Sequence, residues 1–165
     1  MTPHFPGKSF SNNQNTLQEI LERGYLKVGG YFAFPPFLSY AFAGKTMEWF
    51  DIDIIHIILA CLSVIHQQEL TVQYISCFWD YLIPSLKAGR FDIICSAMTI
   101  TEARQRAVDF TRWYYLSAMA ILVLKGNPLN IQSPTDLNQT HLCIEVMGQT
   151  SMHYWLQNHQ VTENA

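Results

Sequence analysis

The chain has 165 residues, of which 49% are hydrophobic and 14% are charged, and its formal net charge at pH 7 is −3. This length fits one ordinary domain, or one small domain with part of another, and the composition argues against a disordered chain. The slightly acidic balance, without a basic stripe interleaved with aromatic residues, disfavours nucleic-acid binding.

The N-terminus and the longest apolar run bear on export and membrane insertion. The first eight residues lack the apolar core of a secretory signal, so no signal peptide is visible. Residues 52–65 form the longest apolar-rich run, but this run contains His56 and is too short to span a bilayer. We expect no membrane span, and we expect either that a signal has been removed or that the chain is a partial or cytoplasmic version of a longer protein.

The cysteines and histidines do not follow a metal-binding pattern. Four cysteines and six histidines are scattered along the chain without a C-x-x-C or an H-E-x-x-H motif. Three of the cysteines, Cys61, Cys95 and Cys143, lie among apolar residues, where a free thiol behaves as a small hydrophobe. We therefore expect core thiols, no metal ion and no cofactor.

Helical and strand-like periods alternate along the chain. After a flexible arm over residues 1–14, the sequence predicts in order helix 15–24, strand 25–30, aromatic loop 31–37, hairpin-like excursion 38–49, helix 51–66, strand 70–75, helix 80–88, strand 91–95, a short helix from 101, extended apolar segment 117–125, helical turn 134–137, strand 141–146 and helix 152–159. This alternation is typical of α/β proteins with a mainly parallel sheet.

Carboxylates stand at the start of two predicted helices. Asp51 and Asp53 are close enough in sequence to suggest acid–base catalysis. Negative charge at a helix start is favourable in itself, so helix capping is the preferred interpretation. Asp80 is expected to cap the helix 80–88 in the same way. The sequence contains no dinucleotide-binding, phosphate-loop or nucleophile-elbow motif.

Residues 96–106, Ser-Ala-Met-Thr-Ile-Thr-Glu-Ala-Arg-Gln-Arg, follow a predicted strand and open a short helix. Thr101 can cap this helix, since its hydroxyl can accept a backbone N–H of the first turn. Arg104 then lies where a capping box has Glu or Gln, and a cation there opposes the helix dipole. A bound anion would reverse that cost, which favours a carboxylate site; a surface ion pair of Arg104 with Glu102 or Asp109 is the alternative.

Three stretches rich in aromatic, hydroxyl or small residues follow predicted strands. They are the loop 31–37, the turn 96–104 and the turn 147–151. Ligands of parallel sheets bind beyond the carboxyl ends of the strands. Because all three stretches follow strands in this sense, the pattern favours the anion site over the surface ion pair.

Several motifs occur in an order and at a spacing that resemble a known family. They are Leu26-Lys27-Val28-Gly29, Phe34-Pro35-Pro36-Phe37, Phe50-Asp51-Ile52-Asp53, Trp79–Asp92, Ser96–Arg104 and Val108-Asp109-Phe110-Thr111. Over residues 16–156 the chain resembles the family 3 extracellular solute-binding proteins of polar amino-acid ABC importers. The resemblance implies an α/β protein of the periplasmic-binding-protein-like, type II fold, in which two lobes close over an amino acid. It implies binding rather than catalysis.

The resemblance also implies how the chain divides and where it acts. Lobe one would span residues 15–120, and the crossover with the beginning of a second α/β lobe would span residues 121–165. The other elements of lobe two would lie beyond Ala165, so the chain resembles a truncated family member. Its partners would be a small polar amino acid and an ABC permease, and its location would be the periplasm.

Four residues match family positions that bind the ligand carboxylate. Arg104 matches the arginine that grips the α-carboxylate, and Thr99 matches a neighbouring hydroxyl and backbone donor. Thr150, which follows Gly148, matches the helix start in lobe two that completes the carboxylate clamp. The resemblance therefore implies a carboxylate site that draws on both lobes.

Five further residues match the family's contacts with the remainder of the ligand. Ser96 and Ala97 match positions that meet the α-amino group through backbone or side chain. Phe34 and Trp79 match aromatic walls. Tyr31 falls where binders of basic amino acids have an acidic residue, so the resemblance argues against a lysine or arginine ligand.

Departures from the family pattern lead to further expectations. Trp49 stands where the family has a glycine. Micromolar affinity requires about 8 kcal/mol of binding free energy, and one lobe with part of another is expected to supply less, so the chain alone should bind weakly or not at all. Three alternatives remain: an enzyme similar to cyclohexadienyl dehydratases, which act on prephenate or arogenate; a ligand-binding domain of a sensor; and an inert remnant of a binding protein.

Overall fold

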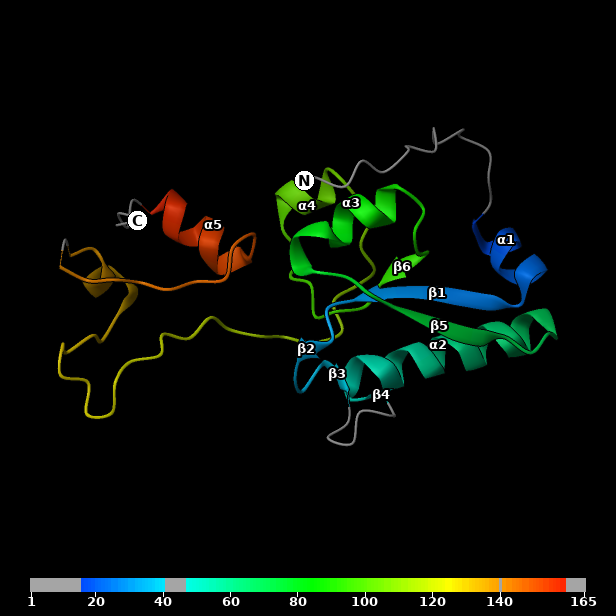
Figure 1. The fold of residues 1–165 in the computed structure, drawn as a ribbon, viewed down its shortest axis with the longest axis horizontal. Helices are drawn as coiled ribbons and strands as arrows, with labels where there is room; N and C mark the ends of the chain where they lie inside the picture. The colour runs from blue at the N-terminus through cyan, green and yellow to red at the C-terminus, as the bar shows by residue number, and fades with distance from the viewer. Residues whose placement is uncertain (1–15, 41–46, 140, 160–165) are drawn as a thin grey trace. The chain divides into compact units, whose positions relative to one another are not determined.

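The computed structural model describes residues 16–40, 47–139 and 141–159. These residues form two compact units, whose elements are shown in Figure 1. The first unit contains the described residues up to Thr99 together with Arg106–Val108, and the second contains Ile100–Gln105 and the described residues from Asp109 onward. The predicted arm over residues 1–14 and the predicted turn at residues 43–45 lie outside the described residues. The lobe boundary at residues 120/121 stays a prediction.

The first unit is built on a parallel sheet with the strand order β5–β1–β6. β1 (Tyr25–Gly30) pairs along its whole length with β5 (Thr71–Ser76), and at Val28 and Gly29 with β6 (Ile93–Ile94). The central strand β1 is buried over most of its length, as expected of a parallel strand that is covered on both faces. The predicted parallel sheet is confirmed.

Helices cover the two faces of this sheet (Figure 1). α2 (Phe50–His66) buries Ile52, Ile55 and Leu59, whose spacing of three and four residues places them on one helix face. α1 (Thr16–Arg23) adds Ile20 to the same core, which contains Leu26 and Val28 of β1. None of the helices in the described ranges combines the length and the apolar character that crossing a bilayer requires.

α3 (Leu82–Lys87) contributes to a separate core cluster around Leu82 and Phe91. It follows a short 3-10 helix, η1 (Trp79–Tyr81), which contains Asp80. No side chain caps the start of either helix, so the prediction that Asp80 caps the helix 80–88 is wrong. The reason is that the 3-10 turn occupies the residues with which the helix was expected to begin.

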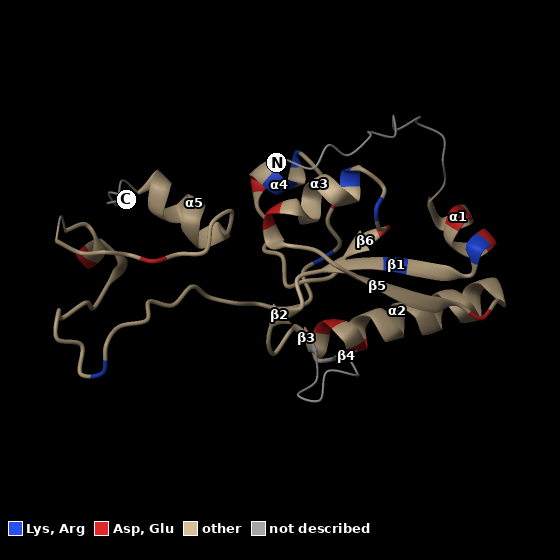
Figure 2. Ribbon diagram, in the orientation of Figure 1, with Lys and Arg blue, Asp and Glu red and all other residues tan. Residues whose placement is uncertain are grey.

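A small antiparallel sheet adjoins the start of α2 in the chain. It contains β2 (Ala33–Phe34), β3 (Leu38–Tyr40) and β4 (Met47–Glu48) in that order. β3 and β4 are antiparallel neighbours, which confirms the predicted hairpin-like excursion. The acidic residues of the first turn of α2 follow β4 directly and are visible in Figure 2.

Two glycines at the end of β1 allow neighbouring side chains to approach the backbone closely. A Cβ atom on Gly29 would lie 2.5 Å from ring atoms of Phe91, and a Cβ atom on Gly30 would overlap the side chain of Leu38. Distances of this size are not tolerated between non-bonded carbon atoms. The motif Leu26-Lys27-Val28-Gly29 is therefore explained in part by packing beneath the ring of Phe91.

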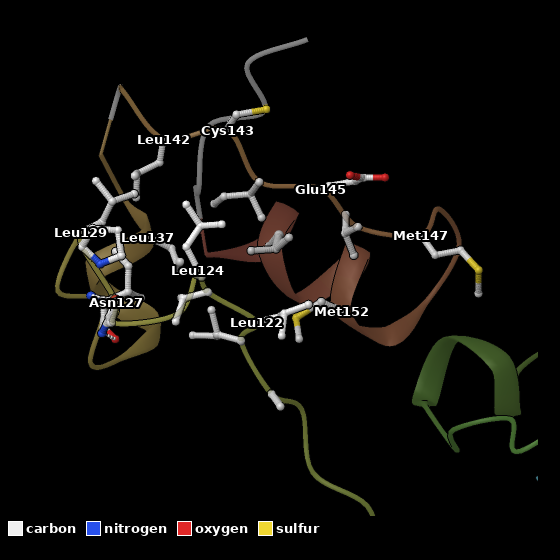
Figure 3. Close-up of a pocket in the computed structure, with 18 residues that line it drawn as sticks. Leu122, Leu124, Asn127, Leu129, Leu137, Leu142, Cys143, Glu145, Met147 and Met152 are labelled. Carbon is white, nitrogen blue, oxygen red and sulfur yellow. Dashed lines mark hydrogen bonds between the residues drawn. The ribbon is translucent and has the colours of Figure 1, made fainter. Parts of the chain in front are cut away.

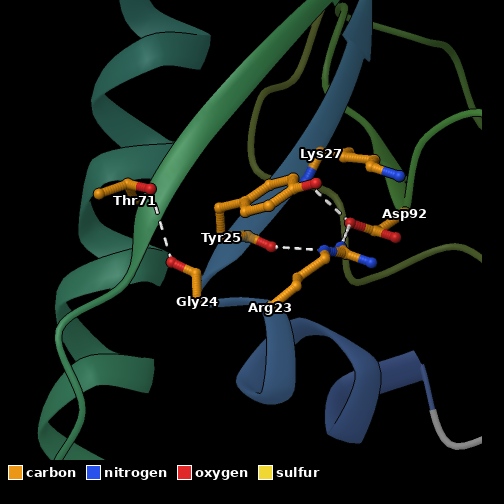
Figure 4. A network of polar contacts seen from close by, with 6 residues as sticks. All are labelled: Arg23, Gly24, Tyr25, Lys27, Thr71 and Asp92. Atoms are coloured by element: carbon orange, nitrogen blue, oxygen red, sulfur yellow. Dashed lines mark hydrogen bonds and ion pairs between the residues drawn. The ribbon is translucent and has the colours of Figure 1, made fainter.

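A polar network joins α1, β1 and the residue preceding β6 (Figure 4). Asp92 forms an ion pair with Arg23, and the same carboxylate oxygen accepts a hydrogen bond of 2.7 Å from the Lys27 N–H. Arg23 Nε donates to the carbonyl oxygen of Tyr25 at 2.8 Å, and its guanidinium lies 5.1 Å from the Tyr25 ring centroid. These contacts hold the beginning of β1 in place.

The second unit contains little regular secondary structure. Its elements are α4 (Glu102–Gln105), η2 (Pro134–Leu137) and α5 (Ser151–Asn158), and its buried apolar residues are Leu137, Leu142 and Leu156. Residues 113–124 have no charged side chain and are exposed throughout (Figure 2).

Residues 141–146 of the second unit were predicted to form a strand, and this prediction is wrong for the described chain, which has no strand there. The reason is that a strand requires a hydrogen-bonded neighbour, and the described residues of this unit include no strand that could pair with it.

The expected core thiols are only partly confirmed. Cys95 is buried, but Cys61 and Cys143 are exposed, and Cys77, for which no burial was predicted, is also buried. Cys61 follows the buried Leu59 by two residues, which turns its side chain to the opposite face of α2. An apolar sequence neighbourhood therefore did not determine which helix face the thiol occupies.

Candidate functional site

In the first unit, the loop after β6 is held by hydrogen bonds to distant residues. Ser96 is buried, and its Oγ accepts a hydrogen bond of 3.0 Å from the Tyr31 N–H. The Ala97 N–H donates to Asp51 Oδ2 at 2.9 Å, and Ala97 has a φ of 46°, in the left-handed region. Because the amide of Ala97 is committed to Asp51, the carbonyl groups of this loop are better suited than this amide to meet a ligand.

Asp51 lies in the first turn of α2, as the capping interpretation expects, but no side-chain capping hydrogen bond forms at this helix start, so that part of the interpretation is wrong. Its side chain is fully buried and reaches the loop after β6, 46 residues along the chain. The residue at the N-cap position of α2 is Trp49, and no side chain caps this helix start. Asp53 is exposed in the first turn, where a negative charge is favourable.

The aromatic residues predicted to line the site fall into two groups within the first unit. Tyr31 and Trp79 both pack against the core cluster that contains Phe91. Phe34 is 44% exposed and stacks on Phe37, with ring centroids 5.9 Å apart. Thr99 is exposed at the end of the first unit. The structure thus brings Tyr31 and Trp79 together and places Phe34 in a separate aromatic pair.

Arg104 lies in the second unit, in α4. Thr101 Oγ1 accepts a hydrogen bond of 3.3 Å from the Arg104 N–H, which confirms Thr101 as the cap of this helix. The Arg104 side chain is not a surface side chain, because the residue is only 7% exposed, and Nη2 donates to the carbonyl oxygen of Gln149 at 2.8 Å. α4 has four residues, so the guanidinium rather than a helix dipole supplies the positive charge.

Burial is the main influence on the pKa of Arg104. It lowers the pKa of the guanidinium from its ordinary value, and the electrostatic effect of Tyr154 acts in the opposite direction. An arginine remains protonated in proteins even when its pKa is lowered. The second unit therefore contains a buried positive charge.

The start of α5 is the neighbour of Arg104. Thr150 is the N-cap of α5: its Oγ1 accepts from the His153 N–H at 3.2 Å and donates to the Met147 carbonyl at 2.7 Å. Gln149, whose carbonyl accepts from Arg104, lies between Gly148 and Thr150 and has a φ of 57°. Arg104, Gly148 and Thr150 are thus brought together, and a ligand contact of Thr150 would come from its backbone N–H.

Gln149 is a central residue of this arrangement that sequence reasoning missed. Its N–H donates to His153 Nδ1 at 3.2 Å, and its side-chain oxygen accepts from the Tyr154 hydroxyl. The contact with Arg104 uses a main-chain carbonyl, which every residue type has. No sequence signal could have identified it.

A cavity of about 720 Å³ lies in the second unit (Figure 3). Its lining is apolar apart from Asn127 and Glu145, and neither Arg104 nor Thr150 lines it. The one charged residue of the lining, Glu145, would repel an anion, so this cavity is distinct from the predicted anion site. Within the described ranges, no cluster of His, Cys, Asp and Glu could hold a metal ion.

A family model described as bacterial extracellular solute-binding proteins, family 3, matches residues 26–160. The chain belongs to this family. The match confirms the resemblance that the motifs suggested, and the members of this family are described as extracellular proteins. The curated relatives are named as binding proteins for amino acids that include histidine, L-cystine, L-arginine and glutamine.

Individual family 3 proteins show how far the likeness extends. A glutamine-binding protein of Geobacillus stearothermophilus is 35% identical over 86% of this chain and 52% of its own length. The crystal structure of the ancestral amino acid-binding protein AncCDT-1, a precursor of cyclohexadienyl dehydratase, is 34% identical with a TM-score of 0.79, and the match covers 87% of this chain and 60% of that one. The predicted α/β fold of a periplasmic amino-acid-binding protein is thereby confirmed.

A single domain of a family 3 protein also matches. A point mutant of the arginine-bound form of domain 1 from TmArgBP is 37% identical with a TM-score of 0.54, over 60% of this chain and 71% of that one. The chain spans between about a third and about a half of the length of the curated relatives it matches.

Trp49 stands where the family 3 pattern has glycine, and its φ of 101° with a ψ of 169° lies in a region that only glycine adopts readily. We expect Trp49→Gly to be more stable than Trp49→Ala by about 1–2 kcal/mol. Both variants lose the indole ring, and only glycine relieves the backbone strain. Urea denaturation of the two variants measures the difference, and equal stabilities would contradict it.

Proposed function

We propose that this chain binds an amino acid and that Arg104 holds the α-carboxylate. The observation that supports this most directly is the buried guanidinium of Arg104 beside the start of α5, in a chain of the solute-binding family. Arginine matches a carboxylate in charge and in planar geometry. In this proposal Thr99 and the backbone at Gly148 and Thr150 supply further donors to the carboxylate.

The α-ammonium group of the ligand requires acceptors, and the loop after β6 has them. Since the Ala97 N–H is donated to Asp51, the carbonyl oxygens of Ser96 and Ala97 are the groups proposed to meet the ammonium. Tyr31, Phe34 and Trp79 are proposed to surround the remainder of the ligand. An uncharged tyrosine at position 31 favours a small polar amino acid over lysine or arginine.

The proposed biological setting is amino-acid uptake. The curated relatives include the binding proteins of ABC transporters, so an ABC permease is the proposed partner and the periplasm the proposed location. In this setting, residues 15–120 would act as lobe one and residues 121–165 as the crossover and part of lobe two. The chain would deliver its amino acid to the permease.

The proposed affinity is weaker than micromolar. Each charge-assisted hydrogen bond supplies about 1.5–3 kcal/mol, but association costs about 4–15 kcal/mol in lost translational and rotational freedom, so the proposed contacts leave less than the roughly 8 kcal/mol that micromolar binding needs. Binding itself remains the proposed outcome, because domain 1 from TmArgBP is known in an arginine-bound form. A single domain of that protein can therefore hold a ligand.

Isothermal calorimetry and ligand-observed NMR with each of the twenty amino acids test the proposal. We expect saturable binding of one or more small polar amino acids, weaker than micromolar, and no comparable binding of lysine or arginine. Absence of saturable binding by any amino acid would overturn the function. Preferential binding of lysine or arginine would overturn the assignment of the ligand class.

A dehydratase is the second candidate, because the precursor of cyclohexadienyl dehydratase is among the matched structures. Arg104 would suit the carboxylates of prephenate or arogenate equally well. The assay is formation of phenylpyruvate from prephenate by the full chain. Turnover above the rate without protein would favour the enzyme over the binding protein.

A further inference from the structure

The fully buried carboxylate of Asp51 is the starting observation. Asp51 belongs to the first turn of α2, where the helix dipole favours its negative charge, and Oδ2 accepts from the Ala97 N–H at 2.9 Å. A polar group is costly to bury, so one that is retained in the interior requires hydrogen-bonding partners. Asp51 therefore stands out from the exposed Asp53 two residues later.

Ala97 is the residue that this carboxylate restrains. Its φ of 46° is unfavourable for a residue with a Cβ atom, so the surrounding structure must hold it in place. Ser96 on one side is fixed through its Oγ contact with Tyr31 N–H. The Ala97 N–H, which donates to Asp51, belongs to the peptide group between Ser96 and Ala97, so this hydrogen bond fixes that peptide group and directs the Ser96 carbonyl away from Asp51.

We infer that Asp51 is a positioning residue for ligand binding: it holds Ala97 in the left-handed conformation and so orients the loop carbonyls toward the α-ammonium group. This inference rests on the proposed function. Asp51 itself does not contact the amino acid. Its influence passes through the backbone of Ala97.

Four variants of the full chain separate positioning from general stability. Asp51→Ala removes the acceptor, whereas Asp51→Asn keeps an oxygen that can accept from the Ala97 N–H. Asp53→Ala is the matched control, because it removes an exposed carboxylate from the same helix turn. The double variant Asp51→Ala, Ala97→Gly restores access to the left-handed conformation without the carboxylate, since glycine adopts it readily.

Two measurements are made on each variant. One is the dissociation constant for whichever of the twenty amino acids binds the wild-type chain most tightly. The other is hydrogen exchange of the Ala97 amide, followed by NMR without ligand. We expect Asp51→Ala to weaken binding and to lower the protection of this amide by about tenfold or more each. Asp53→Ala should bind within about threefold of wild type, and Asp51→Asn and the glycine double variant should each bind more tightly than Asp51→Ala.

Different outcomes overturn the inference about Asp51 and the proposed binding function. Wild-type affinity in Asp51→Ala overturns the inference while the binding function stands. Failure of both Asp51→Asn and the glycine double variant to restore affinity also overturns it, since the defect would then be a general one. If the wild-type chain binds no amino acid, the proposed function fails. Hydrogen exchange then still tests the hydrogen bond by itself: if Asp51 holds the loop, the Ala97 amide loses protection in Asp51→Ala and keeps it in Asp51→Asn.

Discussion

Arg104→Ala is expected to weaken amino-acid binding by about a hundredfold or more, which corresponds to about 3 kcal/mol. The guanidinium is buried, so its hydrogen bonds to a carboxylate would be shielded from water and stronger than surface contacts. Arg104→Lys keeps the charge but loses the planar pair of donors, so its affinity should lie between those of the wild type and Arg104→Ala. Calorimetry on the full chain measures all three affinities.

The control for this prediction is Arg106→Ala. Arg106 is exposed two residues further along the chain, and its replacement should leave the affinity within about twofold of wild type, since an exposed charge contributes little. Thermal unfolding of each variant establishes that it is folded. An unchanged affinity in Arg104→Ala, or an equal loss in Arg106→Ala, would show that Arg104 does not hold the carboxylate.

Asp92→Ala is expected to lower the free energy of unfolding by about 3 kcal/mol. The side chains of Asp92 and Arg23 are only 8% and 19% exposed, so removal of the carboxylate leaves a largely buried guanidinium without its ion-pair partner. The Lys27 N–H also loses its acceptor. Urea denaturation at pH 7 measures the change.

Asp80→Ala serves as the matched control for Asp92→Ala, because Asp80 is exposed and should contribute less than about 0.5 kcal/mol. Asp92→Asn retains an acceptor for the Lys27 N–H but not the charge, and its loss should be intermediate. A double-mutant cycle with Arg23→Ala isolates the ion pair. A loss below about 1 kcal/mol in Asp92→Ala would contradict the importance of the network in Figure 4.

Local patterns predicted the elements that depend mainly on near neighbours. Residues 25–30 and 70–75 were predicted as strands, and the alternating order of helices and strands predicted a mainly parallel sheet, in which the structure pairs these two strands. Thr101 was correctly predicted as a helix cap. Both predictions rest on contacts within a few residues or on a period that any partner would require. The predicted strand 141–146 failed because a strand also depends on a neighbour from elsewhere in the chain.

In the candidate site, too, local features could be predicted from the sequence and long-range contacts could not. Arg104 was singled out because a cation in a first helix turn is locally unfavourable, and the structure shows it buried beside the start of α5. Its partner, the carbonyl of Gln149, could not be predicted because main-chain groups leave no mark in the sequence. Trp49 was recognised as a departure from the family's glycine, but only its positive φ explains why glycine suits that position.

The sequence by itself determined the α/β class and the membership of the solute-binding family, because periodicity and motif order can be read from the chain without knowledge of its fold. Only the tertiary structure decided that Asp51 reaches Ala97 rather than capping α2, and that Cys61 faces outward. These contacts depend on how elements separated by tens of residues are brought together. Their geometry is set by packing, which no local pattern contains.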